Sequence, residues 1–250
     1  MLTIYYILEY TKSEGVEDMR KFVICLVMLL LVASPASACI GARQAAMGWA
    51  GVAISDDATA SYWNPAAMVW AKDGVMYDNI YDRTAIAATY DRFGLCYVDD
   101  WDKTYSYFAV SHKLSESEAV GISVGTFDAK PTSLRSDYHG PTLSASYLAK
   151  SGHFRYGLLL HNGLSVRPGI AYITKLLTVS VEVYDLFSAF WTSHYRVGIE
   201  INPLSFLALR AGFNQYDNAS YYGVGLISPY CSLDFVKTPY GDYYSLSLLI

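Results

Sequence analysis

Charged side chains are scarce in this chain. They make up 16% of its 250 residues, whereas soluble domains carry about 25%. The net charge of -5 at pH 7 shows no excess of Lys and Arg, which argues against a nucleic-acid partner, because such partners need a basic surface. The shortage of charge predicts that something other than water faces part of the surface.

Patterns for catalysis and metal binding are also missing. There is no G-x-S-x-G elbow, and no two of the four cysteines form a C-x-x-C pair. The histidines show no metal-ligand spacing: they are His112, His139, His153, His161 and His194. We therefore expect no enzyme, no metal and no other cofactor.

No apolar run reaches the roughly 20 residues of a membrane-spanning helix. The longest one, residues 22–33, follows the basic stretch 19–21 and precedes Ala36-Ser37-Ala38, which is the arrangement of a secretory signal. We assign residues 1–38 to an upstream extension and signal peptide, with Met19 as the favoured initiator. A cytoplasmic extension before an anchor is the alternative interpretation.

The cysteines leave two questions open. Cys39 follows the cleavage site directly, where a lipid-modified cysteine would stand, although the Ala-x-Ala pattern favours ordinary cleavage. Cys25 is lost with the signal. Cys96 and Cys231 leave room for one disulfide, whose formation their spacing does not determine.

What the sequence does have, beyond residue 73, is alternation. In YRVGIEIN, for example, Tyr195, Val197 and Ile199 point one way, while Arg196, Gly198 and Glu200 point the other. The same period of two appears around residues 120–124, 143–147, 154–160, 177–183 and 207–213. Alternation alone also fits a soluble sandwich with one wet face.

The spacing of the segments favours a barrel over a sandwich. Residues 74–250 hold about 14 candidate strands with no helix-period stretch among them, which suits the strand length of outer-membrane barrels. Connections after even strands are short, including 91–92 and 202–204, whereas 128–140 and 185–193 follow odd strands. We predict an all-β, transmembrane antiparallel β-barrel in the bacterial outer membrane, in contact with its lipid and with both termini on the periplasmic side.

The alternation also sorts charged and aromatic side chains. A charge on the lipid face would cost about 2–4 kcal/mol, so six charged residues are predicted to face the lumen: Arg155, Glu182, Arg196, Glu200, Arg210 and Asp234. We expect them to form ion pairs, or else a polar gate. Tyr105, Tyr107, Trp101, Trp191 and Tyr243 suit interfacial girdles, unless they reflect strand propensity alone.

Residues 39–73 precede the first strand and are rich in Ala and Gly. Such a segment is too small-sided for a core of its own, but it can approach other backbone closely, so we predict a plug inside the barrel. Asn64 suits an N-cap and Pro65 a first helical position, which predicts a short helix from Pro65. Asp56 and Asp57 are expected to cap a turn or to pair with a lumen arginine.

The stretch GARQAAMGWAGVAISDDATASYWNPAAM resembles the N-terminal signature of the FadL-type hydrophobic-compound transporters and their PorV-like relatives. The matching positions are Gly48, Ala50, Ala53, Asp56, Asp57, Ala60, Asn64, Pro65 and Ala66. HYRVGIEINPLSFLALRAGF also resembles the strand-turn-strand pattern of PorV-like barrels. The resemblance implies a 14-stranded outer-membrane barrel with its N-terminal segment in the lumen, although this chain lacks the long loops of the fatty-acid transporters.

Two functions follow from these expectations. The first is passive uptake of small hydrophobic compounds through a plugged lumen, with Asp56, Asp57, Asn64, Pro65 and Ala66 as plug or gate residues. The second is a PorV-like scaffold that docks a secreted or surface-attached protein partner.

Overall fold

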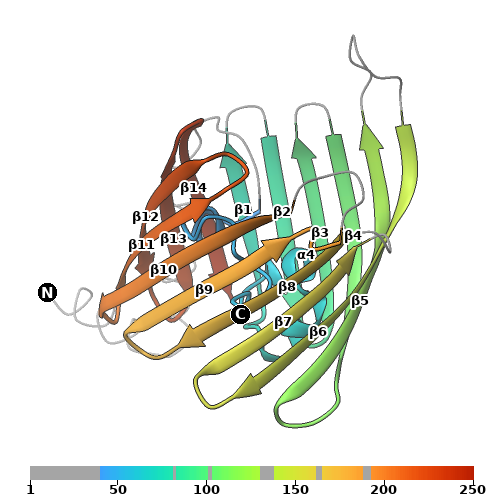
Figure 1. Ribbon diagram of the computed structural model, residues 1–250, viewed down its shortest axis with the longest axis horizontal. Helices are drawn as coiled ribbons and strands as arrows, with labels where there is room; N and C mark the ends of the chain where they lie inside the picture. The colour runs from blue at the N-terminus through green and yellow to red at the C-terminus, as the bar shows by residue number, and fades with distance from the viewer. Residues whose placement is uncertain (1–39, 81–82, 101–102, 130–137, 162–164, 188–192) are drawn as a thin grey trace, which may run out of the picture. The chain divides into compact units, whose positions relative to one another are not determined.

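Fourteen antiparallel strands close into a barrel in the computed structural model (Figure 1). The structure describes residues 40–250 except 81–82, 101–102, 130–137, 162–164 and 188–192. All described residues belong to one compact unit, Pro35–Ile250, and the other unit, Met1–Ser34, lies outside them together with Cys39, the predicted signal and its cleavage site.

Each strand pairs with its neighbours in sequence, and β1 pairs with β14 to close the ring. The strands are β1 Gly74–Ile80, β2 Arg83–Tyr90, β3 Phe93–Asp100, β4 Lys103–Lys113, β5 Glu118–Ala129, β6 Tyr138–Ser151, β7 Phe154–His161, β8 Ser165–Ile173, β9 Leu177–Tyr184, β10 His194–Leu204, β11 Leu207–Asn214, β12 Ala219–Ile227, β13 Cys231–Thr238 and β14 Gly241–Leu249. Closure leaves no sheet edge unpaired. The predicted fold class, an all-β barrel of about 14 strands, is confirmed.

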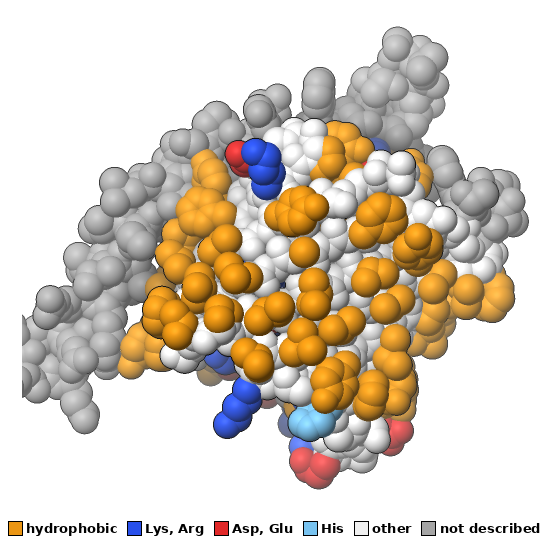
Figure 2. All heavy atoms as spheres, turned by 60° about the vertical axis from the view of Figure 1, so that its left-hand side comes forward, with side chains coloured by type: hydrophobic (Ala, Val, Ile, Leu, Met, Phe, Trp, Pro, Cys, Tyr) orange, Lys and Arg blue, Asp and Glu red, His pale blue; other side chains and the backbone are white. Residues whose placement is uncertain are grey.

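The two faces of the wall differ as the alternation predicts. On β10, Ile199 is 39% exposed on the outer face, whereas its neighbour Glu200 is 4% exposed in the lumen. Figure 2 shows hydrophobic side chains across the middle of one outer face, with charged side chains near its upper and lower ends. The apolar outer face and the polar lumen therefore follow from the period of two.

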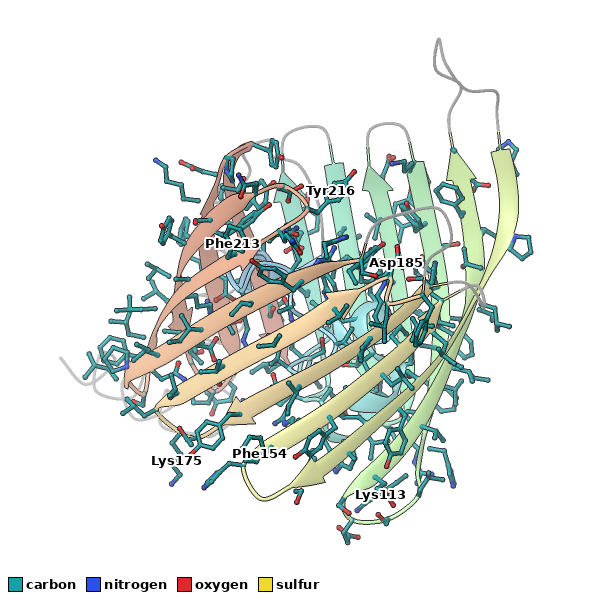
Figure 3. The ribbon with its side chains drawn as sticks, viewed as in Figure 1. Lys113, Phe154, Lys175, Asp185, Phe213 and Tyr216 are labelled. Carbon is teal, nitrogen blue, oxygen red and sulfur yellow. The ribbon has the colours of Figure 1, made fainter. Side chains whose placement is uncertain are left out.

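Short turns lie at one end of the barrel. Lys113 and Lys175 stand near that end in Figure 3, and Asp185 and Tyr216 stand near the other. Two predicted boundaries were wrong. Residues 202–204 belong to β10 rather than to a turn, and the expected loop 128–140 is shorter, because Asp128 pairs with His139 and Phe127 with Gly140.

Residues 40–73, which we call the lumen segment, lie inside the ring of strands. The segment contains α3 (Ala42–Ala46), α4 (Ala60–Trp63) and the 3-10 helix η1 (Pro65–Trp70). α3 packs against β11–β14, α4 against β2–β4 and η1 against β3–β6. Among the described residues, no helix combines the length and the apolar character that crossing a bilayer requires.

Glycine lets the wall and the lumen segment meet backbone to backbone. A Cβ on Gly212 of β11 would lie 2.0 Å from the Gly48 nitrogen, and one on Gly121 of β5 would lie 2.4 Å from the Ala66 nitrogen. The Ala and Gly content of the segment therefore serves close approach to the wall at widely separated strands.

Three of the residues proposed for interfacial girdles lie in the lumen instead. Tyr107 and Tyr243 are buried in an aromatic cluster there, and Tyr105 packs against the same cluster. Along each strand they alternate with outward-facing residues such as Phe108, so their rings point into the lumen. The predicted position in an interfacial girdle was wrong for these three residues. Trp101 and Trp191 lie outside the described residues. Cys96 and Cys231 are free cysteines.

Candidate functional site

Asn64 caps η1 and joins the lumen segment to the wall. Its Oδ1 accepts a hydrogen bond from the Ala66 nitrogen at 3.1 Å, and its Nδ2 donates to the carbonyl oxygens of Val52 at 2.8 Å and Tyr147 at 3.3 Å. Pro65 and Ala66 are buried in the first turn of η1. The predicted start of a short helix at Pro65 is confirmed, although the helix is 3-10 rather than α.

Arg43 connects the lumen segment to the acidic residues of the wall. Its Nε and Nη2 donate to the two oxygens of Glu200 at 2.9 and 3.1 Å, which is a bidentate pair. The same Glu200 accepts from Arg210 Nε at 2.6 Å, and Arg210 also pairs with Asp234. The arrangement therefore alternates in sign from Arg43 through Glu200 and Arg210 to Asp234.

Asp56 and Asp57 extend this network within the lumen segment. Asp56 lies 2.6 Å from Arg43 Nη1 and 3.4 Å from Arg155 Nη1 of β7. Asp57 accepts hydrogen bonds from the nitrogen and the hydroxyl of Thr59. Burial raises the pKa of both carboxyls; at Asp56 the charges of Arg43 and Arg155 outweigh it, so that the pKa lies below its ordinary value, whereas the pKa of Asp57 is raised.

We expect acid to weaken the anchoring of the lumen segment through Asp56. A lowered folded-state pKa means that its contribution is complete above the ordinary pKa of 3.8 and is lost as the pH falls through the folded value. The raised pKa of Asp57 acts in the opposite sense, since its charge costs stability at neutral pH. Unfolding midpoints of the wild type and Asp56→Asn, measured from about pH 7 down to about pH 2, should converge.

The exposed turn residue Asp91 provides the control for this comparison, because its side chain is 67% exposed. Asp91→Asn should follow the wild type at every pH. A difference between the wild type and Asp56→Asn that stays constant with pH would show that the Asp56 carboxylate does not anchor the segment.

A second ion pair lies farther from the short turns than the network around Arg43. Glu182 of β9 accepts a hydrogen bond from the Val52 nitrogen at 3.0 Å and lies 3.4 Å from Arg196 of β10. Arg196 also donates to the Trp49 carbonyl oxygen at 3.3 Å. Both wall residues therefore contact the backbone of the lumen segment as well as each other.

Aromatic rings gather between the lumen segment and the wall. Trp49 and Trp63 of the segment stack with ring centroids 6.2 Å apart, and Trp49 also lies 6.1 Å from Tyr221 of β12. On the other side, Tyr62 meets Tyr107 of β4 edge to face at 5.8 Å. We call these residues, with Tyr105 and Tyr243, the aromatic cluster.

The charged network borders a cavity of about 630 Å³ at the short-turn end. Its lining includes Arg43, Asp56, Arg155 and Glu200, together with turn residues such as Lys175. The lumen is thus divided into a charged compartment near the short turns and an aromatic region farther in. The described residues contain no group of three or more His, Cys, Asp or Glu side chains placed to hold a metal ion.

The six predicted lumen charges all face inward, and four of them share the network around Arg43: Arg155, Glu200, Arg210 and Asp234. Sequence reasoning missed Arg43 itself, because the lumen segment has no strand alternation to indicate where its side chains point. It also missed Asp78 of β1, which accepts a hydrogen bond from the Gly41 nitrogen. The inward parity of β1 was the available signal for Asp78.

The geometry defines a closed 14-strand antiparallel barrel whose lumen holds its own N-terminal segment. No family model and no curated protein matches the sequence. Among solved structures, the chain is similar to the CymD monoaromatic hydrocarbon channel, with a TM-score of 0.53 and 11% identity over 86% of this chain and 97% of CymD. At this identity the likeness shows a shared fold. The FadL-type resemblance, its PorV-like branch and the scaffold function stay predictions.

Proposed function

We propose that this protein is an outer-membrane channel for passive uptake of small hydrophobic compounds. The observation that carries the proposal is the aromatic cluster, which places tryptophan and tyrosine rings inside the barrel, away from the charged compartment. Aromatic side chains supply a large apolar surface for binding in such a setting. The fold shared with a monoaromatic hydrocarbon channel agrees with this function.

The charged compartment makes a straight path to the short-turn end unfavourable for such a compound. An apolar molecule there would displace water from ion-paired groups without replacing their hydrogen bonds. An apolar groove of about 570 Å³ lies on the outer wall over β2–β5. Its lining includes Tyr107 of the aromatic cluster and Cys96, which is buried next to that cluster. We therefore place the exit through this part of the wall, toward the bilayer.

In this function the predicted gate residues hold the lumen segment in place. Asp56 fastens it to Arg155, and Asn64 fastens it to β6 through the Tyr147 carbonyl oxygen. Asp57 orders the Thr59 turn, while Pro65 and Ala66 seat η1 against Gly121. If the lumen segment moves to open a path for the compound, some of these contacts must break.

Uptake of radiolabelled toluene by cells expressing the full chain tests the proposal. We expect Tyr62→Gln to slow uptake severalfold, because the amide removes an aromatic surface next to Trp63 and Tyr107. The matched control is Tyr195→Gln, the same change on the outer face of β10, where the ring is exposed and lies away from the groove over β2–β5.

Glucose uptake measured in the same cells reports general leakiness and should not differ between the variants. Toluene uptake by the wild type that equals that of cells without the protein would reject the function. Equal slowing by both tyrosine variants would reject the aromatic cluster as the path.

A further inference from the structure

Arg167 of β8 is a cation in the lumen whose contacts with the described residues are all to neutral groups. Gly169, two residues along the strand, faces Val52 and Ala53 of the lumen segment, so Arg167 shares the inward face. Its Nε donates to Ser165 Oγ at 3.2 Å, and its Nη2 donates to the Tyr184 hydroxyl at 2.6 Å. The guanidinium carbon lies 3.9 Å from the centre of the Tyr184 ring.

The neighbouring carboxylates are engaged elsewhere. Glu182 binds the Val52 nitrogen and Arg196, and Asp185 accepts a hydrogen bond from Ser165. Within the described part of the chain, no carboxylate oxygen lies within the 4.0 Å that defines an ion pair with Arg167. Of the five N–H donors of a guanidinium, the two at Nη1 have no partner among these contacts, and they share an edge with Nη2. This edge matches the two oxygens of a carboxylate.

Aromatic side chains continue from this cation across the wall. Ser165 pairs with His161 of β7, and the His161 ring lies 6.4 Å from Tyr107 of the aromatic cluster. Tyr105 in turn stacks with Tyr107 and lies 4.9 Å from Phe127. Beyond these contacts, the charge of Arg167 acts at longer range on His161, on Tyr107 and on the Glu182 carboxylate, which is not within ion-pair distance. A cation with an open donor edge therefore borders the aromatic surface.

We propose that the lumen face of β4–β8 selects aromatic compounds that carry a carboxylate, with the ring against the Tyr107 side and the carboxylate on the open edge of Arg167. This inference rests on the proposed uptake function and narrows its substrate class. A neutral hydrocarbon has no oxygen to accept the guanidinium N–H groups, whereas a carboxylate gains a charge-assisted bidentate pair. A cationic aromatic compound would be repelled.

Ligand binding to the full chain in lipid nanodiscs tests the proposal. The probes are 4-butylbenzoate and butylbenzene, which share the ring and the alkyl chain, and binding is followed by tryptophan fluorescence. We expect Arg167→Gln to weaken 4-butylbenzoate binding about tenfold and to leave butylbenzene binding unchanged. Each affinity is compared between variants for the same ligand, because the partition of that ligand into the nanodisc lipid is then the same in every measurement. Arg92→Gln, at the exposed turn between β2 and β3, is the matched control and should change neither affinity.

One further variant keeps the outcome decisive. Arg167→Lys keeps the charge but loses the planar edge, so it should lie between the wild type and Arg167→Gln, and it replaces the latter if Gln prevents folding. Unchanged 4-butylbenzoate affinity in the substituted protein would overturn the proposal. Wild-type protein that binds butylbenzene but not 4-butylbenzoate would overturn it as well while leaving the uptake function standing, whereas the absence of binding by both would count against both.

Discussion

Glu200→Gln is expected to lower the free energy of unfolding by about 3 kcal/mol, the lower end of the range for breaking a buried ion pair. Glu200 is 4% exposed and is the acceptor for both Arg43 and Arg210. The neutral amide leaves two guanidinium groups without their shared counter-ion. Arg43 keeps Asp56 and Asp57, and Arg210 keeps Asp234, which is why the loss should not reach the upper end.

Denaturant titration followed on unboiled gels measures this loss, because a folded barrel and an unfolded chain migrate differently. Glu116→Gln is the control, since Glu116 pairs with Lys113 in an exposed turn and its side chain is 95% exposed. It should stay within about 0.5 kcal/mol of the wild type. If Glu200→Gln also stays within that margin, the network does not anchor the lumen segment.

Gly212→Val should prevent the lumen segment from seating against β11 and raise the conductance of the barrel severalfold. The added Cβ would lie 2.0 Å from the Gly48 nitrogen and 2.4 Å from the Met47 carbonyl carbon. Both are backbone atoms, so no side-chain rotation relieves the clash, and the cost exceeds the roughly 1–3 kcal/mol of ordinary overpacking. The wall itself can stay closed, because the β10–β11–β12 pairing uses backbone groups.

Single-channel recordings in planar bilayers provide the readout. Ala211→Val makes a similar addition at the next residue, whose parity faces the outside of the barrel, and should leave the conductance at the wild-type value. Equal conductance in the wild type and Gly212→Val would show that the lumen segment does not restrict the pore.

The wall was predictable from sequence because a strand with one apolar face reveals its orientation at every second residue. Ile199 and Glu200 are assigned to opposite faces by parity alone, and the structure places them so. The same parity assigns Tyr107 to the lumen face, where the structure has it, although aromatic residues are also typical of interfacial girdles. The prediction of a turn at 202–204 was wrong because Asn202 and Pro203 are typical of turns, yet β10 continues to Leu204.

The lumen segment was only partly predictable. The Asn64-Pro65 step indicated a helix start because capping is a local interaction between neighbouring residues. The position of Arg43 had no such local signal. Its partner Glu200 lies 157 residues away in the sequence, and nothing between them indicates the pairing.

The sequence by itself determined that this chain builds a wall with one apolar face and one polar face, because the period of two and the cost of a misplaced charge act on each strand separately. Only the tertiary structure decided which lumen charges meet, where the aromatic cluster forms and which cation keeps an open edge. These contacts depend on closing β1 against β14 and on seating the lumen segment inside the ring, so they arise only when distant parts of the chain are brought together.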